Sequence, residues 1–250
     1  MELITSPLLS VPHGFPTREG GVSKGPFASL NCAVSVGDAP AAVEENLRRL
    51  AAAAHVEPGA LLTVSQVHGD VVLRAGAAGG PHLRPTLGEA DGLWTDAPGT
   101  AVGVRTADCL PILFEDRVGR RVAAVHAGWR GVIADIAVRA LERLVAAGTR
   151  PGDVRVAIGP CIQRCCFEVD GDLAGRFAAA FGDEVVVAVE GKAKRHLDLP
   201  RAVQVALGRA GLPMAHVAAL PHCTMCDARF FSHRRERGTT GRHLSFITCR

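Results

Sequence analysis

The chain has 250 residues, of which 48% are hydrophobic and 21% are charged, and its formal net charge is +3. This length and composition are those of one folded globular domain and exclude a largely disordered chain. The small net charge disfavours general attraction to nucleic acid or to a membrane surface, and the absence of tyrosine excludes a tyrosyl acid, base or nucleophile.

The first residues and the cysteines indicate the compartment. Met1–Pro7 has neither a basic start nor a long apolar run, so we expect no signal peptide. No stretch of the chain approaches the ~20 apolar residues that cross a bilayer. Eight cysteines in a chain of this size, without an export signal, are expected to be reduced thiols, so the sequence predicts a cytoplasmic protein.

Hydrophobic periodicity predicts an alternation of helices and strands without an internal repeat or a linker, and hence a single domain over residues 1–250. A strand, a helix and a further strand over residues 121–158 predict an α/β fold. In chain order, we expect a helix at 40–54, strands at 61–67 and 71–73, a Gly-rich loop at 76–81, strands at 101–105, 110–114 and 121–125, a helix at 132–147, a strand at 154–158, a helix at 173–181, a strand at 184–189, a helix at 198–210 and a strand at 216–220.

Three residues of metal-ligand type stand where predicted strands give way to turns. They are His68, Cys109 and His126. Two imidazoles and one thiolate form a catalytic zinc set that leaves a fourth position open for water or substrate. They lie far apart in the chain with no fixed interval, so their spacing is a weak signal, and the alternative is that the histidines are satisfied polar groups and Cys109 is a buried thiol.

The turn Gly128–Gly131 connects a predicted strand to a predicted helix. Free backbone N–H groups and the helix dipole favour an anion at such a turn, and Arg130 could add a charged fork. The alternative is a tight connection in which Trp129 fills the core and Arg130 is solvated. Neither a dinucleotide fingerprint nor a P-loop occurs in the chain.

Two further clusters leave alternatives open. Cys223 and Cys226 form a C-x-x-C pair that needs a second pair for a structural zinc site, and Cys161, Cys165 and Cys166 could supply it in space. Otherwise these are core and surface thiols. The basic run at 232–237, together with Arg242, is either a solvated face or a phosphate-binding segment.

Several segments, taken together, resemble one family over about residues 13–247. The chain is similar to the bacterial laccase-domain or polyphenol oxidase-like proteins, also labelled peptidoglycan editing factor, whose better-supported activity is purine nucleoside phosphorylase. The segments that carry the resemblance are His13–Ser23, Ser29–Asn31, Gln66–Gly69, Thr106–Pro111, Val125–Gly131, Ile158–Pro160, Phe230–Arg235 and Thr240–Arg242.

The resemblance implies a four-layer α/β/β/α fold with mixed sheets, similar to the catalytic domain of a deamidating bacterial toxin. It implies that His68, Cys109 and His126 bind zinc and act in catalysis. It also places Arg18 and Asn31 in motifs that line the family's pocket, and with Arg130 these are the expected substrate contacts. The sequence departs from the family where tyrosine is common, at Phe27 and His233.

The resulting hypothesis is a zinc-dependent enzyme that cleaves adenosine, inosine or methylthioadenosine with phosphate, with adenosine deaminase as an additional activity. Its partners are then a purine nucleoside and phosphate, without nucleic acid or membrane, and the oligomeric state stays open. The alternatives are a Cys–His amidase or hydrolase acting on a peptidoglycan precursor, and a non-catalytic zinc-binding module. A copper polyphenol oxidase is disfavoured because the ten histidines are scattered and no H-x-H pair occurs.

Overall fold

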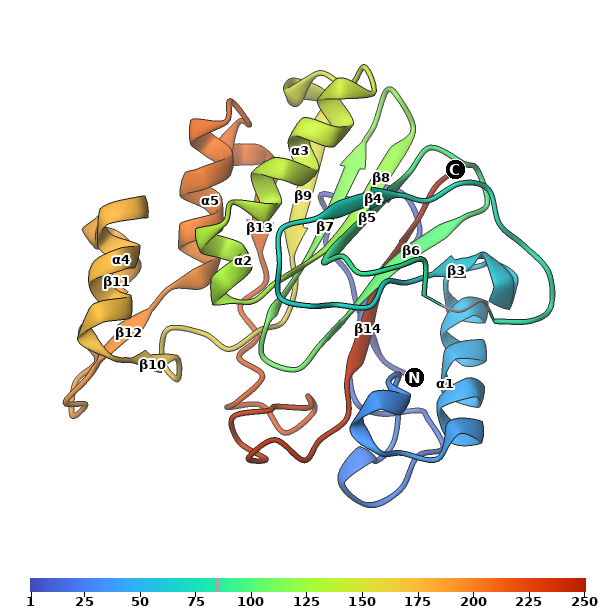
Figure 1. Ribbon diagram of the computed structural model, residues 1–250, viewed down its shortest axis with the longest axis horizontal. Helices are drawn as coiled ribbons and strands as arrows, with labels where there is room; N and C mark the ends of the chain where they lie inside the picture. The colour runs from blue at the N-terminus through green and yellow to red at the C-terminus, as the bar shows by residue number, and fades with distance from the viewer. Residues whose placement is uncertain (84–85) are drawn as a thin grey trace.

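The computed structural model describes residues 1–83 and 86–250, in which two large mixed sheets pack face to face (Figure 1). The six-stranded sheet has the order β13 (Val217–Ala219), β9 (Val154–Ile158), β7 (Leu110–Asp116), β8 (Arg121–Ala127), β5 (Gly92–Thr95) and β4 (Val72–Arg74). The five-stranded sheet has the order β1 (Leu3–Ile4), β2 (His13–Pro16), β14 (His243–Thr248), β6 (Ala101–Thr106) and β3 (Leu61–Leu62). A small third sheet contains β10 (Glu168–Val169), β12 (Arg195–Leu197) and β11 (Val186–Val187).

Helices cover the outer faces of the two large sheets. Helix α1 packs its apolar side against the five-stranded sheet, whereas α2 and α3 pack on the six-stranded sheet. Helix α5 packs against α2, α3 and α4, and α4 lies on the small third sheet; Figure 1 shows α1 and α5 on opposite sides of the large sheets. The helices are α1 (Pro40–Ala53), α2 (Trp129–Ile133), α3 (Ile136–Ala146), α4 (Gly171–Phe181) and α5 (Leu199–Arg209), with short 3-10 helices η1 (Gly25–Phe27), η2 (Val34–Val36), η3 (Pro58–Ala60), η4 (Pro151–Asp153), η5 (Asp183–Val185) and η6 (Met214–His216). No helix among the described residues is long and apolar enough to cross a membrane.

The crossover from β8 to β9 confirms the α/β interpretation. Both strands pair antiparallel with β7, one on each side, so they run parallel to one another and need a crossover connection. The expected helix at 132–147 was wrong in its bounds, because the segment forms α2 and α3 with a break between them. Asp135 at the break has a φ of 56°, a left-handed conformation that aspartate tolerates better than most residues.

Other expected strands were too long or were missed. The expected strand at 61–67 ends at Leu62, because the side chain of Gln66 pairs with the backbone of Arg105 in place of a strand: each donates to the other at 2.7 Å. The expected strand at 184–189 is η5 followed by the two-residue β11. Strands β1, β2, β5, β10, β12 and β14 were not expected.

Strand β14 is central in its sheet and buried along its whole length. Its first residue, His243, accepts at Nε2 a hydrogen bond from the backbone N–H of Phe231 at 2.8 Å. Burial, together with the nearby charge of Arg18, lowers the pKa of His243 to about 3, so the imidazole is neutral in the folded protein.

Candidate metal centre and its pocket

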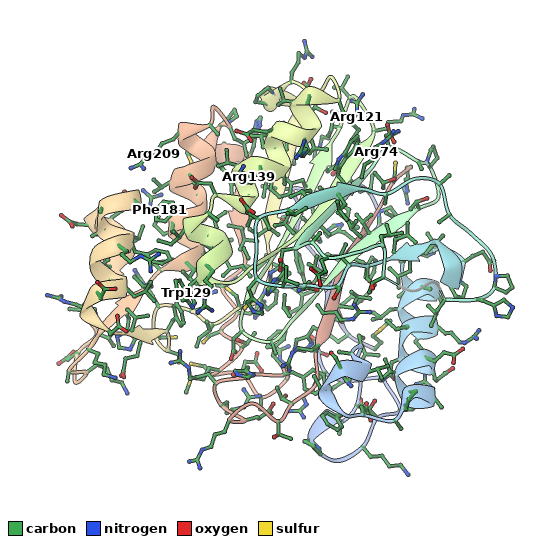
Figure 2. The ribbon with its side chains drawn as sticks, in the orientation of Figure 1. Arg74, Arg121, Trp129, Arg139, Phe181 and Arg209 are labelled. Atoms are coloured by element: carbon green, nitrogen blue, oxygen red, sulfur yellow. The ribbon has the colours of Figure 1, made fainter. Side chains whose placement is uncertain are left out.

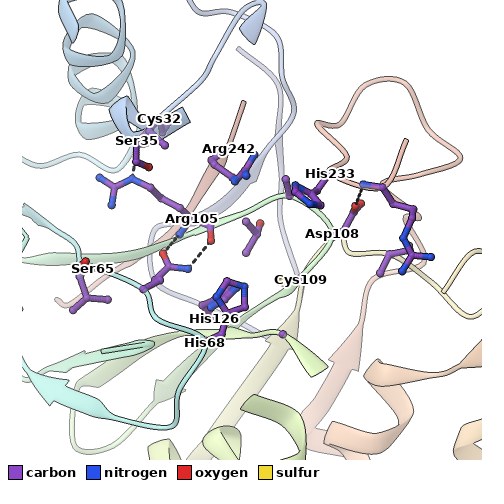
Figure 3. Close-up of a pocket in the computed structure, with 18 of the residues that line it drawn as sticks. Cys32, Ser35, Ser65, His68, Arg105, Asp108, Cys109, His126, His233 and Arg242 are labelled. Carbon is purple, nitrogen blue, oxygen red and sulfur yellow. Dashed lines mark hydrogen bonds between the residues drawn. The ribbon is translucent and has the colours of Figure 1, made fainter. Parts of the chain in front are cut away.

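The three residues of metal-ligand type meet at one edge of the six-stranded sheet. His126 lies near the end of β8, and Cys109 directly precedes β7, whose first residues pair with the last residues of β8. His68 lies in the loop between β3 and β4. The ligand atoms of the three side chains all lie within 4.8 Å of one another, and Figure 3 shows the two imidazoles side by side. Figure 2 places Trp129, just beyond this edge, far from Arg74 and Arg121 at the opposite end of the sheet.

Asp91 holds two of these residues in place, and sequence reasoning missed it. Its carboxylate is fully buried and accepts hydrogen bonds from His126 Nδ1 at 2.7 Å and from the backbone N–H groups of Val67, His68 and Gly69 at 3.2, 3.0 and 2.6 Å. Burial raises the pKa of Asp91, but these hydrogen bonds outweigh it and hold the pKa below its usual value. With the proton on Nδ1, His126 presents Nε2 to the centre, the arrangement found around protein-bound metals.

The local backbone is shaped to bring the donors together. His68 and Asp108 have φ values of 61° and 82°, in the left-handed region that residues other than glycine rarely adopt. Asp108 is held there by hydrogen bonds to its carboxylate from Thr224 Oγ1 at 2.6 Å and the Arg234 N–H at 2.7 Å.

Gly128 supplies the space that the donors need. A Cβ atom at this position would lie 3.1 Å from His68 Cδ2 and 3.2 Å from Cys109 Sγ, tighter than ordinary contact. The two side chains therefore occupy the volume that any larger residue would fill. The soft thiolate and two imidazoles, so assembled, could hold a metal ion.

The protonation of the cluster is also set by its neighbours. Burial raises the pKa of Cys109, but the charge and hydrogen bonds of His126 and His68 outweigh it and lower the pKa to about 6. Burial lowers the pKa of His126, but Cys109 and Asp91 outweigh it and raise the pKa to about 9. Cys109 and His126 therefore form a thiolate–imidazolium pair near neutral pH, and a metal ion bound by this group would displace the proton on His126 Nε2.

A cavity of about 770 Å³ opens onto the cluster. Arg105 and Arg242 lie across the cavity from the two histidines (Figure 3). The Nε of Arg105 donates to the Cys32 carbonyl at 2.6 Å, and Arg242 Nη1 donates to the Thr240 and Gly241 carbonyls at 2.9 and 3.0 Å. The wall also contains polar side chains, among them Ser35, Gln66, Asp108 and His233. Its apolar part is formed by Val34, Val43, Leu47, Trp129, Ile162, Phe167 and Leu199.

The structure does not bring the other expected contacts into this cavity. Among the described residues, Arg18, Asn31 and Arg130 are absent from its lining. Arg18 donates to the Ala28 carbonyl at 2.7 Å and to Glu236 at 2.9 Å.

Asn31 and Arg130 likewise have partners of their own. Asn31 is fully buried, and its Oδ1 accepts the Arg242 N–H at 2.9 Å, so it acts on the cavity through that arginine. Arg130 stacks over Trp129 with its guanidinium carbon 4.4 Å from the ring centre. Direct contact of Arg18, Asn31 or Arg130 with substrate therefore stays a prediction.

The structure also places the basic run and the additional cysteines, for which the sequence left two interpretations. In the basic run at 232–237, Arg234 lines the cavity, whereas Arg235 donates to the backbone carbonyls of Thr224 and Phe230. Of the five cysteines considered for a second site, Cys161 lies in the hydrophobic core, and the other four gather in one group: Cys165, Cys166, Cys223 and Cys226.

Fold and site together define an α/β protein with a His–Cys–His group, able to hold a metal, at the mouth of an internal cavity. The comparisons agree. The chain belongs to the family described as multi-copper polyphenol oxidoreductase laccase, whose sequence model matches residues 12–250. The resemblance seen in the sequence motifs is thereby confirmed.

Relatives of the chain carry the name of an enzyme. A protein of Deinococcus radiodurans named purine nucleoside phosphorylase is 40% identical over 247 residues, covering 99% of this chain and 92% of its own length. The Geobacillus stearothermophilus protein named purine nucleoside phosphorylase YlmD is 36% identical over 96% of this chain and 91% of its own length.

Solved structures show the same fold. The crystal structure of YlmD superposes with a TM-score of 0.86 over 95% of this chain and 91% of that chain, at 36% identity. A Bacillus licheniformis hypothetical protein, YfiH, superposes with a TM-score of 0.87 at 32% identity over 95% of this chain and 92% of that chain. The mixed α/β fold of a single domain is therefore shared with these proteins.

Proposed function

We propose that the protein is a zinc-dependent purine nucleoside phosphorylase of the cytoplasm. The observation that carries the proposal is the pairing, in one cavity of about 770 Å³, of the cluster of His68, Cys109 and His126 with the guanidinium groups of Arg105 and Arg242. A nucleoside and a phosphate dianion together need such a cavity, with apolar walls for the base and fixed cations for the phosphate. The names of the relatives support the same activity.

In the proposed reaction, a phosphate oxygen bonds to C1′ of the ribose while the bond from C1′ to the base nitrogen breaks. The products are the ribose 1-phosphate and the free base, and the base nitrogen takes up the proton that hydrogen phosphate loses. The sugar passes through an oxocarbenium-like state, so the protein must hold the phosphate close to C1′ on one face. Arg105 and Arg242 hold the phosphate, and the apolar wall near Phe167 and Trp129 receives the purine.

His68, Cys109 and His126 are the proposed ligands of zinc, and Asp91 orients His126 and the loop of His68. Zinc held there supplies a Lewis acid and lowers the pKa of water, the chemistry that attack on C6 of adenosine requires. Adenosine deaminase is therefore the proposed additional activity. The substrates proposed for phosphorolysis are adenosine, inosine and methylthioadenosine.

Arg18, Asn31 and Arg130 are proposed as positioning residues for substrate binding. Asn31 fixes the backbone of Arg242, and Arg18 ties Glu236 in the loop that carries Arg234 to the N-terminal part of the chain. Arg130, stacked on Trp129, keeps that ring against the cavity.

A second candidate function rests on the thiolate–imidazolium pair. Cys109 as nucleophile would form a thioester with the acyl group while the C–N bond of the amide breaks and the amine leaves with a proton from His126. Water, deprotonated by His126, would then attack the thioester, releasing the acid and the Cys109 thiol. The four-layer α/β/β/α arrangement and the similarity to a deamidating toxin domain belong to this proposal. Its substrate would be an amide of a peptidoglycan precursor.

The test is to incubate the pure protein with adenosine, inosine and methylthioadenosine, with and without phosphate, and to identify the products alongside metal analysis. Base release that depends on phosphate, lost in Cys109→Ser together with zinc, is the expected result. Metal-free amidase activity without base release would favour the second candidate. Zinc without any turnover would indicate a binding module, and stoichiometric copper with oxidation of phenols would indicate an oxidase.

A further inference from the structure

A second group of four cysteines, none of which lines the cavity, lies on two loops that leave the same edge of the six-stranded sheet. Cys165 and Cys166 follow β9, and Cys223 and Cys226 follow β13. These strands are parallel neighbours, so the loops that follow them begin side by side. A further backbone pairing between Cys161 and Cys223 keeps the loops together beyond the strands.

The four sulfur atoms are arranged as ligands of one ion. All of them lie within 4.8 Å of one another, with Cys166 Sγ 3.3 Å and Cys165 Sγ 3.7 Å from Cys226 Sγ. Tetrahedral zinc with Zn–S bonds of about 2.3 Å requires S···S separations of about 3.8 Å. The sulfurs thus already stand near the distances that coordination needs.

Backbone donors surround the most buried of the four sulfurs. The N–H of Gln163 points to Cys223 Sγ at 3.5 Å, and the backbone of Met225 and Cys226 also hydrogen-bonds this sulfur. A turn in which the N–H groups after the first cysteine of C-x-x-C face its sulfur is suited to a thiolate, because each donor offsets part of its charge. Four thiols of a solvated surface would not need such a shell.

We propose that Cys165, Cys166, Cys223 and Cys226 bind one zinc ion in a closed structural site, separate from the His–Cys–His centre. Four protein ligands leave no open position, so this ion holds loops together and takes no substrate. The chemistry of an all-thiolate set selects zinc over the oxygen-preferring cations. The proposal does not depend on which reaction the cavity performs.

The zinc-bound loop would hold part of the cavity in place. Thr224, between the two later cysteine ligands, donates to Asp108 at 2.6 Å, and Asp108 is the neighbour of Cys109. Arg235 donates to the carbonyls of Thr224 and Met225 at 2.6 and 3.2 Å, so the loop is also fastened to the segment of Arg234. Loss of this zinc should therefore loosen the cavity as well as the loop.

Zinc counting in the whole protein, purified under reducing conditions, tests the proposal. Wild type should hold about two zinc ions per chain, one in an open three-ligand site and one in a closed four-ligand site. The double variant His68→Ala with Cys109→Ser should keep about one, as should Cys166→Ser with Cys226→Ser, each through the remaining site. Cys249→Ser, a cysteine outside both groups, is the matched control and should match wild type.

Cobalt substitution keeps the test decisive if a cysteine variant fails to fold. In the double variant His68→Ala with Cys109→Ser, bound cobalt should show the intense visible bands and the sulfur charge-transfer absorption of a tetrahedral tetrathiolate site. The proposal is overturned if that variant binds no zinc or cobalt, or if the metal bound is iron. It is also overturned if mass analysis of the wild type purified in air shows a disulfide between Cys166 and Cys226 in place of the ion.

Discussion

Replacing Asp91 with asparagine should weaken the metal centre more than any other change outside the three ligands. Oδ1 of Asp91 accepts from His126 Nδ1 and the His68 N–H, and Oδ2 accepts from the N–H groups of Val67 and Gly69. Asparagine has nearly the same shape but only one acceptor oxygen. Whichever way its amide turns, an NH2 group faces two N–H donors.

The magnitude follows from these four bonds. Hydrogen bonds to a charged group contribute about 1.5–3 kcal/mol each, so the loss of two lowers the free energy of unfolding by about 3–6 kcal/mol as an upper estimate. The Asp91 side chain is fully buried, so solvent does not screen the loss. Removal of a carboxylate behind a metal-binding histidine typically lowers metal affinity about 10–100-fold, and we expect Asp91→Asn to lower zinc affinity by this factor.

Competition with a chelator measures zinc affinity, and urea denaturation measures stability. The matched control is Asp96→Asn, at the other end of β5, where an exposed ion pair with Arg74 contributes about 0–1 kcal/mol. The control should leave zinc affinity unchanged. If Asp91→Asn binds zinc as tightly as wild type, Asp91 does not orient the ligands and the reasoning is refuted.

Three more predictions concern the cavity and the fold. Arg242→Ala should raise the KM for phosphate by about 10–100-fold, the worth of one charge-assisted bond, without loss of zinc; a normal phosphate dependence would place the anion elsewhere. Gly128→Ala should weaken zinc binding, measured by chelator competition, because its Cβ meets His68 and Cys109 at 3.1 and 3.2 Å; unchanged affinity would show that these side chains can move. The lowered pKa of His243 means that its neutral form stabilises the fold above its ordinary pKa of 6.5 and that this stability is lost as pH falls toward 3. Wild type should therefore lose about 2 kcal/mol more than His243→Gln between about pH 6.5 and pH 5 in urea denaturation, and equal losses would contradict the buried neutral imidazole.

The strands that could be predicted from the sequence are those whose residues are mostly apolar. Strands β7, β8 and β9 are mostly apolar stretches between turn residues, with Arg155 as a polar interruption in β9, and the expected ranges at 110–114, 121–125 and 154–158 fall within them. Strand β14 was missed because its polar residues, His243, Ser245 and Thr248, are buried with the apolar ones, so its sequence is neither a continuous apolar run nor a strict alternation. These polar residues of β14 are buried by segments that are distant in the sequence, so a short stretch of sequence around the strand does not reveal their burial.

Some residues of the candidate site could likewise be predicted from the sequence, and others could not. The three residues of metal-ligand type could be selected from the sequence because few residue types bind soft metals. They also stand at the ends of predicted strands, and the ends of neighbouring strands lie together at one edge of a sheet. Asp91 could not be selected, since a carboxylate before a strand carries no signal of its own. Arg105 was likewise overlooked, whereas Arg242 was named with the basic run at 232–237 as a possible phosphate-binding group and does line the cavity. Arg18 lies in a more specific motif but is held by Ala28 and Glu236.

Asp108 joins the cavity to the cysteine-bearing loops. Its φ of 82° fixes the direction in which Cys109 leaves the turn, and this conformation persists only because Thr224 and the Arg234 backbone hold the carboxylate. Thr224 in turn lies between two of the four clustered cysteines. A cavity built mostly from loops needs a fixed point beyond the strand ends, because a loop anchored only at its strand leaves its tip free to move. One zinc ion bound by the four cysteines would hold the loop of Thr224 in place. Because Thr224 holds Asp108, the ion would also fix the position of the neighbouring Cys109 thiolate in the metal centre.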